Sequence, residues 1–509
     1  MKQKNDPVFS LIKRMTKGEK RYFQLVNTKY SGGKQTKHMQ LYNFIDKSTD
    51  PKDIEIQSKI KNYRVVKNQL YKLIIETLTT YHLKNNEFCT IDRMVLKAKV
   101  LLKKNMYEEC LHFITKTKPV LLEQERYLVL VKLYELEDTA LLYSKPYDSY
   151  FSEESNKITT VTELFKKYYN FLEARATFKK AGEILPKVDL NRITDYQTTK
   201  NEFLSYLEDL EKGALSKRAL RYIYKSRVYF HLTFNELTIA RDYQIKIKNL
   251  THEMYAIGTL TVEYPAFTII NLTAMELKMG INEGEVRFEE FKKLESQVHG
   301  MKEKDLCYLG KTYCQVLYLW GSEDIPAILK IYSKIPKEIL QEIGKIEPRL
   351  ELDLFYMIAL SHFFNENYAE ASDLVSLLIE EISPHSNIHI YTSCLILNLL
   401  IHFEIGNYQF LEGLGKSTKR KIKRMHKLDA LNDKLLNFFS NKLQKTALTE
   451  FPKSFEKLIS TSTLNEALIS ISSISSSYNL IYYWMNAKAK NLKLKAYIQG
   501  EIKLHDYSN

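Results

Sequence analysis

Apolar residues recur along most of the chain at the three- and four-residue spacing of an α-helix. A clear case is "YRVVKNQLYKLIIETLTTYHL", residues 63–83, where one face carries Val66, Leu70, Leu73, Ile74 and Leu78. The opposite face of that segment carries Arg64, Lys67 and Lys72. Only 16 Gly and 11 Pro interrupt the 509 residues, which favours long helices joined by short turns. The pattern therefore predicts an all-α protein.

Shorter helical segments precede residue 63. We expect a helix near residues 7–15, a second one through "KRYFQLVNTKY" and a third through "HMQLYNFIDKS". Thr16 followed by Glu19 is a capping-box pattern that opens the second helix, and Asp50-Pro51 starts a further helical stretch. Residues 1–84 are therefore predicted to form a helical N-terminal subdomain.

The stretch "LFYMIALSHFFNENYAEASDLVSLLIEEISP", residues 354–384, predicts two antiparallel helices that turn at "NENY". Small residues at Ala359 and Ala371 would let the two helices approach closely. The bulky positions that interlock around them are Phe355, Ile358 and Val375. This arrangement resembles a tetratricopeptide repeat unit, although Val375 stands where that family has an aromatic residue.

Similar hairpins occur elsewhere in the chain. Ala98 and Cys110 take corresponding positions in "MVLKAKVLLKKNMYEECLHFITKTKP", and Ala327 does so after a "GSED" turn. Aligned on Ala327, Ala371 and Leu411, successive units are 44 and 40 residues apart, which is longer than the roughly 34 residues of a standard repeat. We therefore predict a degenerate tetratricopeptide-like helical-hairpin solenoid over residues 85–444.

The C-terminal segment, residues 445–509, has a different composition. Serine accumulates up to Ser477, and "YNLIYYWM" then supplies an apolar cluster. The last unit of a solenoid must cover an apolar layer that has no further neighbour. We expect Trp484, together with Leu480, Ile481 and Tyr482, to close that layer in C-terminal capping helices.

Positive charge is concentrated in the N-terminal subdomain. Residues 1–84 contain 18 Lys and Arg against 7 Asp and Glu, a net charge of +11, whereas the whole chain carries +14. Such a face either contacts solvent or neutralises the phosphates of a nucleic acid. The candidate polyanion-binding residues here are Lys13, Arg14, Lys17, Lys20 and Arg21.

A second basic run, "KSTKRKIKRMHK", spans residues 416–427. Its candidate polyanion-binding residues are Lys419, Arg420, Lys423 and Arg424. The overlapping "GLGKST" is similar to a phosphate-binding loop, but Phe410 stands where that motif needs its first glycine. A helix entering the run also differs from the strand that such a loop follows, so we interpret the run as a basic repeat helix.

Other chemistry has weak support in the sequence. The odd number of scattered cysteines indicates buried apolar positions rather than disulfides. His385 and His389 are four residues apart but lack the companion glutamate of a zinc-binding helix. No G-x-S-x-G nucleophile motif occurs. We therefore predict that the protein is not an enzyme and binds no cofactor or metal ion.

The N-terminal residues lack the apolar segment of a secretory signal, and no apolar run reaches the length of a membrane span. We expect a cytoplasmic protein that binds a protein or peptide partner. The alternative is a nucleic-acid-binding regulator, because a basic head followed by repeats resembles the layout of bacterial peptide-sensing transcription regulators. The whole chain is similar to an uncharacterised group of bacterial helical-repeat proteins, through "LIKRMTKGEKRYFQL", "VVKNQLYKLIIETL" and "HFEIGNYQFLEGLGKSTKR".

Overall fold

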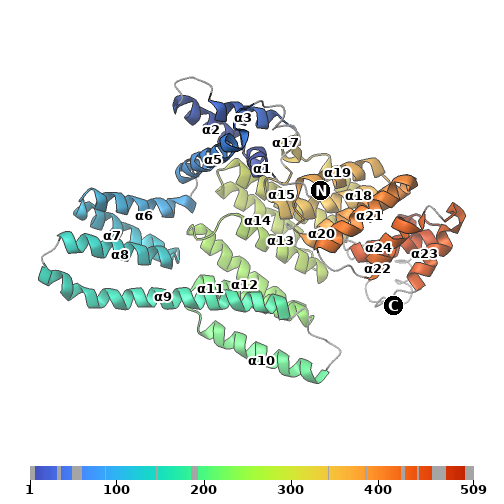
Figure 1. Ribbon diagram of the computed structural model, residues 1–509. Helices are drawn as coiled ribbons and strands as arrows, with labels where there is room; N and C mark the ends of the chain where they lie inside the picture. Colours follow the sequence, from blue (N-terminus) through green and yellow to red (C-terminus); the bar gives the residue numbers. More distant parts are fainter. Residues whose placement is uncertain are drawn as a thin grey trace. The chain divides into compact units, whose positions relative to one another are not determined.

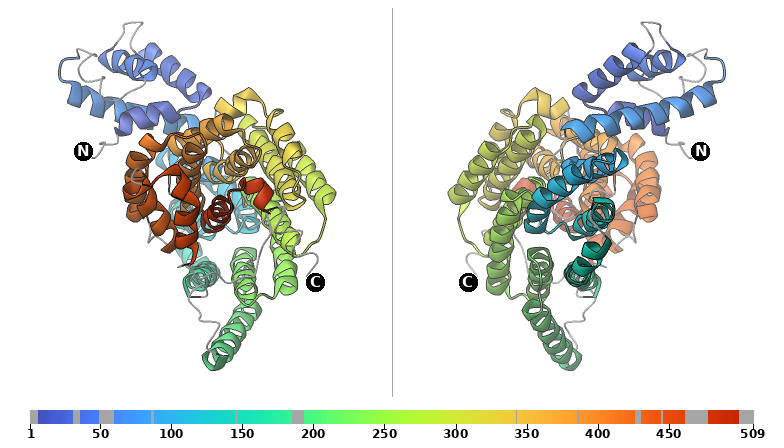
Figure 2. Two further views of the ribbon diagram at one scale, coloured as in Figure 1. Left: turned by 90° about the vertical axis from the view of Figure 1, so that its right-hand side faces the viewer. Right: turned by 90° about the vertical axis from the view of Figure 1, so that its left-hand side faces the viewer.

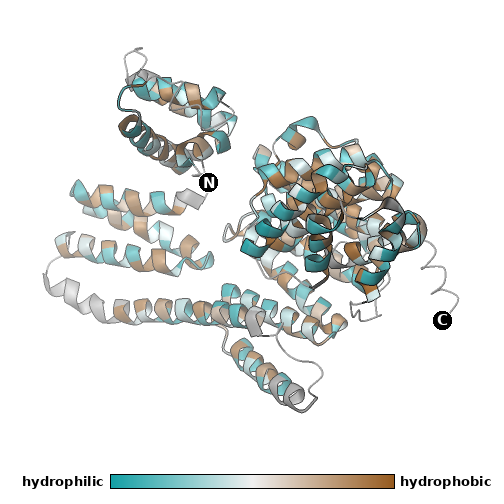
Figure 3. Ribbon diagram, turned by 45° about the vertical axis from the view of Figure 1, so that its right-hand side comes forward, coloured by the Kyte–Doolittle hydropathy of each residue, from teal (hydrophilic) through white to brown (hydrophobic). Residues whose placement is uncertain are grey.

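The computed structural model describes residues 6–30, 36–48, 60–85, 88–144, 147–184, 193–341, 343–384, 387–425, 430–443, 446–460 and 477–498. Every secondary-structure element within these ranges is helical (Figure 1), so the all-α prediction is confirmed. Apolar and polar residues alternate along the helices (Figure 3), as the helical periodicity of the sequence predicts.

The chain divides into two units, residues 1–173 and residues 174–509. The helices of unit 1 are α1 (Pro7–Arg14), α2 (Lys17–Tyr30), α3 (Lys37–Lys47), α5 (Tyr63–Asn85), α6 (Phe88–Lys103), α7 (Tyr107–Glu123), α8 (Tyr127–Ser144) and most of α9 (Tyr147–Ile184). The 84/85 and 444/445 boundaries stay predictions, since neither coincides with this division.

Unit 2 begins within α9. It continues with α10 (Ile193–Lys212), α11 (Lys217–Thr233), α12 (Leu237–Ala256), α13 (Glu263–Lys278), α14 (Gly284–Gln297), α15 (Met301–Gly321), α16 (Ile325–Tyr332), α17 (Lys337–Gln341), α18 (Pro348–Phe364), α19 (Tyr368–Glu381), α20 (Ile388–Glu404), α21 (Tyr408–Met425), α22 (Ala430–Asn441), η3 (Leu448–Glu450), α23 (Phe451–Ser460) and α24 (Ser477–Ala489).

The first four described helices, α1, α2, α3 and α5, share one apolar core, which includes Ile12, Phe23, Leu41 and Leu70. The capping box is confirmed: the backbone N–H of Glu19 donates to the Thr16 hydroxyl at 3.3 Å, and the Thr16 N–H donates to the Glu19 carboxylate at 2.7 Å. The segment predicted to start at Asp50-Pro51 lies outside the described residues. The helix expected over residues 63–83 is α5.

A second core in unit 1 joins α6, α7 and α8, which pack against one another. Leu133 is fully buried in it, and Leu164 of α9 belongs to the same core. With 38 residues, α9 is long enough to contribute Leu164 to unit 1 and Ala181 to a core of unit 2.

One turn geometry recurs between consecutive helices. A residue with positive φ follows the end of the first helix. The backbone N–H of the residue after it donates to the carbonyl oxygen five residues earlier, at 2.8 to 3.0 Å. The second helix begins at the residue that follows this donor. This is the Schellman arrangement, which satisfies carbonyl groups left free at a helix end. The positive-φ residues of these turns are Asn105, Glu125, Asn235, Glu323, Glu366 and Gly406. The turns predicted at "NENY" and "GSED" are among them.

Helices of unit 2 pack mainly on their neighbours in the sequence. The helix α18 contacts α19 and α20, and α20 contacts α21. In both views of Figure 2 the helices follow one another in chain order around an arc, from the green α12 to the orange α21. A single large apolar core runs from Val262 to Ile498, so these helices are held together by continuous burial rather than by separate small cores.

The C-terminal helix α24 packs on α20, α22 and α23. Trp484 is fully buried, and its ring lies 5.0 Å from that of Phe403 and 5.1 Å from that of Phe455. Its indole N–H donates to the Glu404 carboxylate at 2.6 Å, so the polar edge of the buried ring has a partner. The predicted burial of Trp484 is confirmed. Residues 461–476, in the Ser-rich stretch, lie outside the described residues.

Candidate interaction surfaces

The residues predicted to pack the 354–384 hairpin come together. Ala359 and Ala371 are fully buried, and they belong to the same core as Phe355, Ile358 and Val375. The two alanines come from α18 and α19, which are adjacent antiparallel helices. Small side chains at these positions allow the helix axes to approach closely.

The remaining predicted packing positions divide into two kinds. Ala98 and Cys110 are fully buried in the α6–α8 core, where the Cys110 thiol lies 3.5 Å from the Ala98 carbonyl oxygen. Ala327 is only half-buried, because it lies in the first turn of α16 and its N–H donates to the Asp324 carboxylate. The buried positions of that helix are Ile325 and Ile328.

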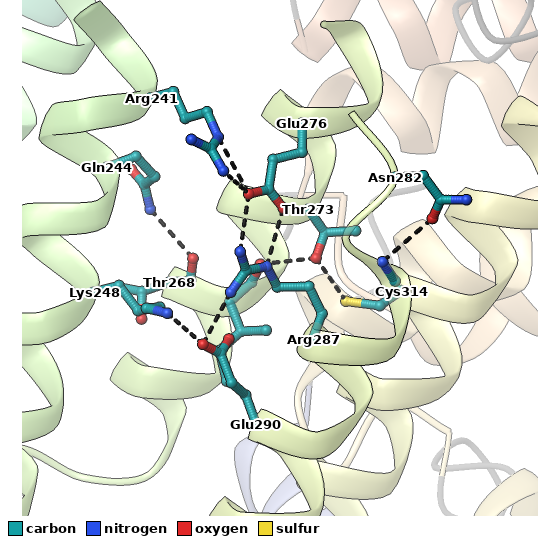
Figure 4. A network of polar contacts seen from close by, with 12 residues as sticks. Arg241, Gln244, Lys248, Thr268, Thr273, Glu276, Asn282, Arg287, Glu290 and Cys314 are labelled. Atoms are coloured by element: carbon teal, nitrogen blue, oxygen red, sulfur yellow. Dashed lines mark hydrogen bonds and ion pairs between the residues drawn. The ribbon is translucent and has the colours of Figure 1, made fainter. Parts of the chain in front are cut away.

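A charged network connects α12, α13 and α14 (Figure 4). The fully buried Glu276 carboxylate accepts hydrogen bonds from Arg241 at 2.9 Å and from Arg287 at 2.9 and 3.0 Å. Arg287 also donates to Glu290, which pairs with Lys248. Burial alone would lower the pKa of Arg287, but these carboxylates raise it above its usual value. The network therefore pairs each buried charge with an opposite one. These residues were not identified as candidates from the sequence.

The basic face of the N-terminal subdomain has two parts. Lys13 donates to the Asp46 carbonyl at 2.8 Å, and Lys20 pairs with the Asp46 carboxylate at 2.7 Å. These two lysines therefore connect the first two helices to α3. Arg14, Lys17 and Arg21 are exposed, and within the described ranges they form no ion pair. Of the five candidate residues, these three are therefore available to an external anion.

The second basic run lies in α21. Lys419 pairs with Asp433 of α22 at 2.9 Å, while Arg420, Lys423 and Arg424 are exposed. The "GLGKST" segment is interior to this helix, so it does not form a phosphate-binding loop. A Cβ atom at Gly415 would lie 3.1 Å from the Ser440 hydroxyl, which places this glycine at the close approach of α21 and α22.

The cysteine thiols and histidine rings are the candidate reactive and metal-binding groups. Cys307 and Cys314 are buried, and burial raises the pKa of each thiol to about 12, so both remain protonated near neutral pH. His385 lies outside the described residues, and His389 lies in the first turn of α20. Within the described part of the chain, no group of three or more His, Cys, Asp or Glu is placed to hold a metal ion. The same part contains no helix of the length and apolar character that a membrane crossing requires.

One exposed apolar surface was not predicted. On α9, Ile158, Phe165, Tyr169 and Leu172 are spaced seven, four and three residues apart, so they form a single stripe along the helix. Tyr169 is 70% exposed and Ile158 is 62% exposed, although Leu164 and Phe171 on another face are buried. The spacing was a signal that could have been found in the sequence, but spacing alone does not tell which of two apolar faces remains exposed.

Comparison with protein-family models, with curated proteins and with solved structures finds no match for this chain.

Proposed function

We propose that the protein is a non-catalytic, tetratricopeptide-like helical-repeat scaffold of the cytoplasm that binds a protein partner. Two features support the repeat assignment: the recurrent turn between helices, and the packing of successive helices on their sequence neighbours. Both arise from hairpins added one after another rather than from contacts between distant segments.

The proposal that the protein binds a partner rests on the exposed stripe on α9. From Ile158 to Leu172 it extends over four helical turns, about 21 Å at 1.5 Å per residue. Exposed aromatic residues of this size are costly to leave in water, and patches of this kind mark interaction sites. Phe165 and Tyr169, one turn apart, form the centre of the stripe.

A stripe with spacings of seven, four and three residues follows the heptad spacing of a coiled-coil seam and therefore fits the apolar seam of a second helix. We therefore assign the occupant as an amphipathic helix of a partner protein, bound with its apolar side on Phe165 and Tyr169. Glu163 and Lys166 pair with each other at 2.6 Å and lie outside the stripe on the same helix.

The test compares three full-length proteins in pull-downs from the native cell, quantified by mass spectrometry. The stripe variant is Phe165→Asp with Tyr169→Asp, and the control is Glu163→Gln with Lys166→Gln, which removes an exposed ion pair of the same helix outside the stripe. We expect a partner retained by the wild type and by the control, and reduced at least tenfold with the stripe variant. A synthetic peptide from its amphipathic helix should bind the purified protein. Equal capture by all three proteins would exclude the stripe as the binding surface.

The exposed Arg14, Lys17 and Arg21 favour a second function, binding of nucleic acid by the N-terminal subdomain. Lys17 and Arg21 are one turn apart on α2, and Arg14 ends α1, so all three lie near the junction of these helices. Exposed cations without an ion pair are the groups that neutralise phosphates.

Duplex DNA binding at several salt concentrations tests this alternative. The triple variant Arg14→Glu, Lys17→Glu and Arg21→Glu is compared with Lys278→Glu, Lys330→Glu and Lys337→Glu, which changes the net charge equally at exposed positions of unit 2. Loss of three phosphate contacts should lower the slope of log affinity against log salt by about 3 in the first variant alone. Equal weakening by both variants would indicate a general charge effect.

A further inference from the structure

The helix α11 carries one buried and one half-buried cation that have no acidic partner among the described residues. Arg221 and Lys225 are four residues apart, so they lie on one face of the helix. Arg221 is 4% exposed, and Lys225 is half-buried. Their surroundings differ from those of the other buried cations in this unit.

Arg221 is held by neutral groups. Its Nε–H donates to the Thr251 hydroxyl of α12 at 3.0 Å, and the centre of its guanidinium lies 4.7 Å from the ring of Tyr264 of α13. The Nη groups of Arg221 have no hydrogen-bond partner among the described residues. Burial lowers the pKa of Arg221, and the nearby charge of Arg218 lowers it further.

Lys225 is surrounded by aromatic rings. Its Nζ lies 5.6 Å from the ring of Phe178 and 5.5 Å from that of Tyr222. Phe178 comes from the C-terminal part of α9 and contacts the rings of Tyr222 and Tyr229, so the ammonium group lies beside a cluster of packed aromatic side chains. Burial, together with the positive charge of Arg221, lowers the pKa of Lys225 to about 8. No carboxylate contributes to the shift of either cation.

Five other buried or half-buried cations of unit 2 are paired with a carboxylate. The pairs are Arg227 with Glu211, Arg241 and Arg287 with Glu276, Lys248 with Glu290, and Lys200 with Glu236. A buried cation without a counter-charge is destabilising, because desolvation is not offset by ionic attraction. Two such cations at one place therefore indicate that a ligand supplies the negative charge.

We propose that Arg221 and Lys225 bind a phosphate group, as free phosphate or as a phosphate monoester. Two positive charges match a phosphate dianion, whereas a single carboxylate would leave one of them uncompensated. The free N–H groups of Arg221 can donate two parallel hydrogen bonds to phosphate oxygens, and Lys225 adds a point charge. The rings of Phe178 and Tyr222 exclude water from one side of the site. The site lies in unit 2 and does not depend on the α9 stripe.

The first test is calorimetric titration of the full-length protein with inorganic phosphate at pH 7, with ionic strength held constant by sodium chloride. Lys225→Met should weaken binding at least tenfold. Lys246→Met is the matched control, because Lys246 also lies over two tyrosine rings, those of Tyr224 and Tyr243, but is exposed and outside the site. It should bind phosphate like the wild type. Absence of phosphate binding by the wild type, or equal binding by Lys225→Met, would overturn the proposal.

Competitive labelling of the unmodified protein gives an independent readout that requires no variant. An amine-reactive acetylating reagent at pH 8, followed by peptide mass spectrometry, reports the accessibility of each lysine. Phosphate should reduce labelling of Lys225 several-fold and leave Lys246 unchanged, whereas sodium chloride of equal ionic strength should protect neither. Equal protection by both salts would exclude a specific site. Titration with phenyl phosphate then separates the two sources: tighter binding than inorganic phosphate assigns a monoester, and weaker or equal binding assigns the free ion.

Discussion

The loss of stability caused by a larger side chain at one buried position depends on how closely two helices approach there. Ala371 is fully buried between α18 and its neighbours, whereas Ala369, two residues earlier on the same helix, is exposed. Ala371→Tyr should lower the free energy of unfolding by about 1 to 3 kcal/mol through overpacking. Ala369→Tyr should change it little. Chemical denaturation of both variants measures the difference, and equal stabilities would mean that Ala371 does not lie at a close helix contact.

The buried carboxyl of Glu351 should make stability depend on pH. Burial raises its pKa from 4.5 to about 7, although the N–H of Gly344 donates to it at 3.1 Å. The folded protein therefore keeps a proton that the unfolded chain loses above pH 4.5. The stability from this group is present below pH 4.5 and is lost as pH rises towards 7, by up to about 3 kcal/mol.

Glu351→Gln removes this titration, because an amide does not ionise in this range. Relative to the wild type, the variant should become progressively more stable between pH 4.5 and 7, measured by denaturant unfolding at several pH values. Glu380→Gln, at an exposed position of α19, serves as the control and should differ from the wild type by a constant amount. A constant difference for Glu351→Gln would contradict the assignment.

At the scale of the helical elements, the recurrent turn predicts opposite changes in stability for two glycine-to-alanine substitutions. Gly406 has a φ of +79°, whereas Gly413 lies within α21, and a Cβ atom at either position would meet no atom within 4 Å. Gly406→Ala should therefore cost about 1 to 2 kcal/mol for the left-handed conformation alone. Gly413→Ala should stabilise the protein by about 1 kcal/mol through helix propensity. Thermal unfolding of the two variants measures both effects, and changes of the same sign would be incompatible with the left-handed turn.

The elements themselves were largely predictable from the sequence. The Thr16–Glu19 capping box, the turn between Phe364 and Tyr368, and the helix over residues 63–83 all depend on groups a few residues apart. Hydrogen bonds at helix ends and apolar periodicity are local, so a single sequence contains the information that places them.

At the scale of the whole molecule, the C-terminal helices cover an aromatic layer. Phe403, Phe439 and Trp484 are buried together, and Lys488 pairs with the same Glu404 carboxylate that accepts from the indole. Truncation after Asn441 would remove α23 and α24 and expose this layer to water. We expect a lower melting temperature and concentration-dependent aggregation, measured by thermal unfolding and light scattering. A truncated protein with the wild-type melting temperature would show that these helices do not cover the core.

The sequence by itself determined that the protein is helical, where several helices and turns lie, and that positive charge concentrates in the first 84 residues. Tertiary structure alone decided which charged side chains pair with one another inside the protein and which do not. Lys20 meets Asp46 across 26 residues, Glu276 holds Arg241 across 35, and Arg221 reaches Thr251 across 30 without meeting an acid. Desolvation and Coulomb attraction depend on distances in space between segments remote in sequence, and helical periodicity contains no information about those distances.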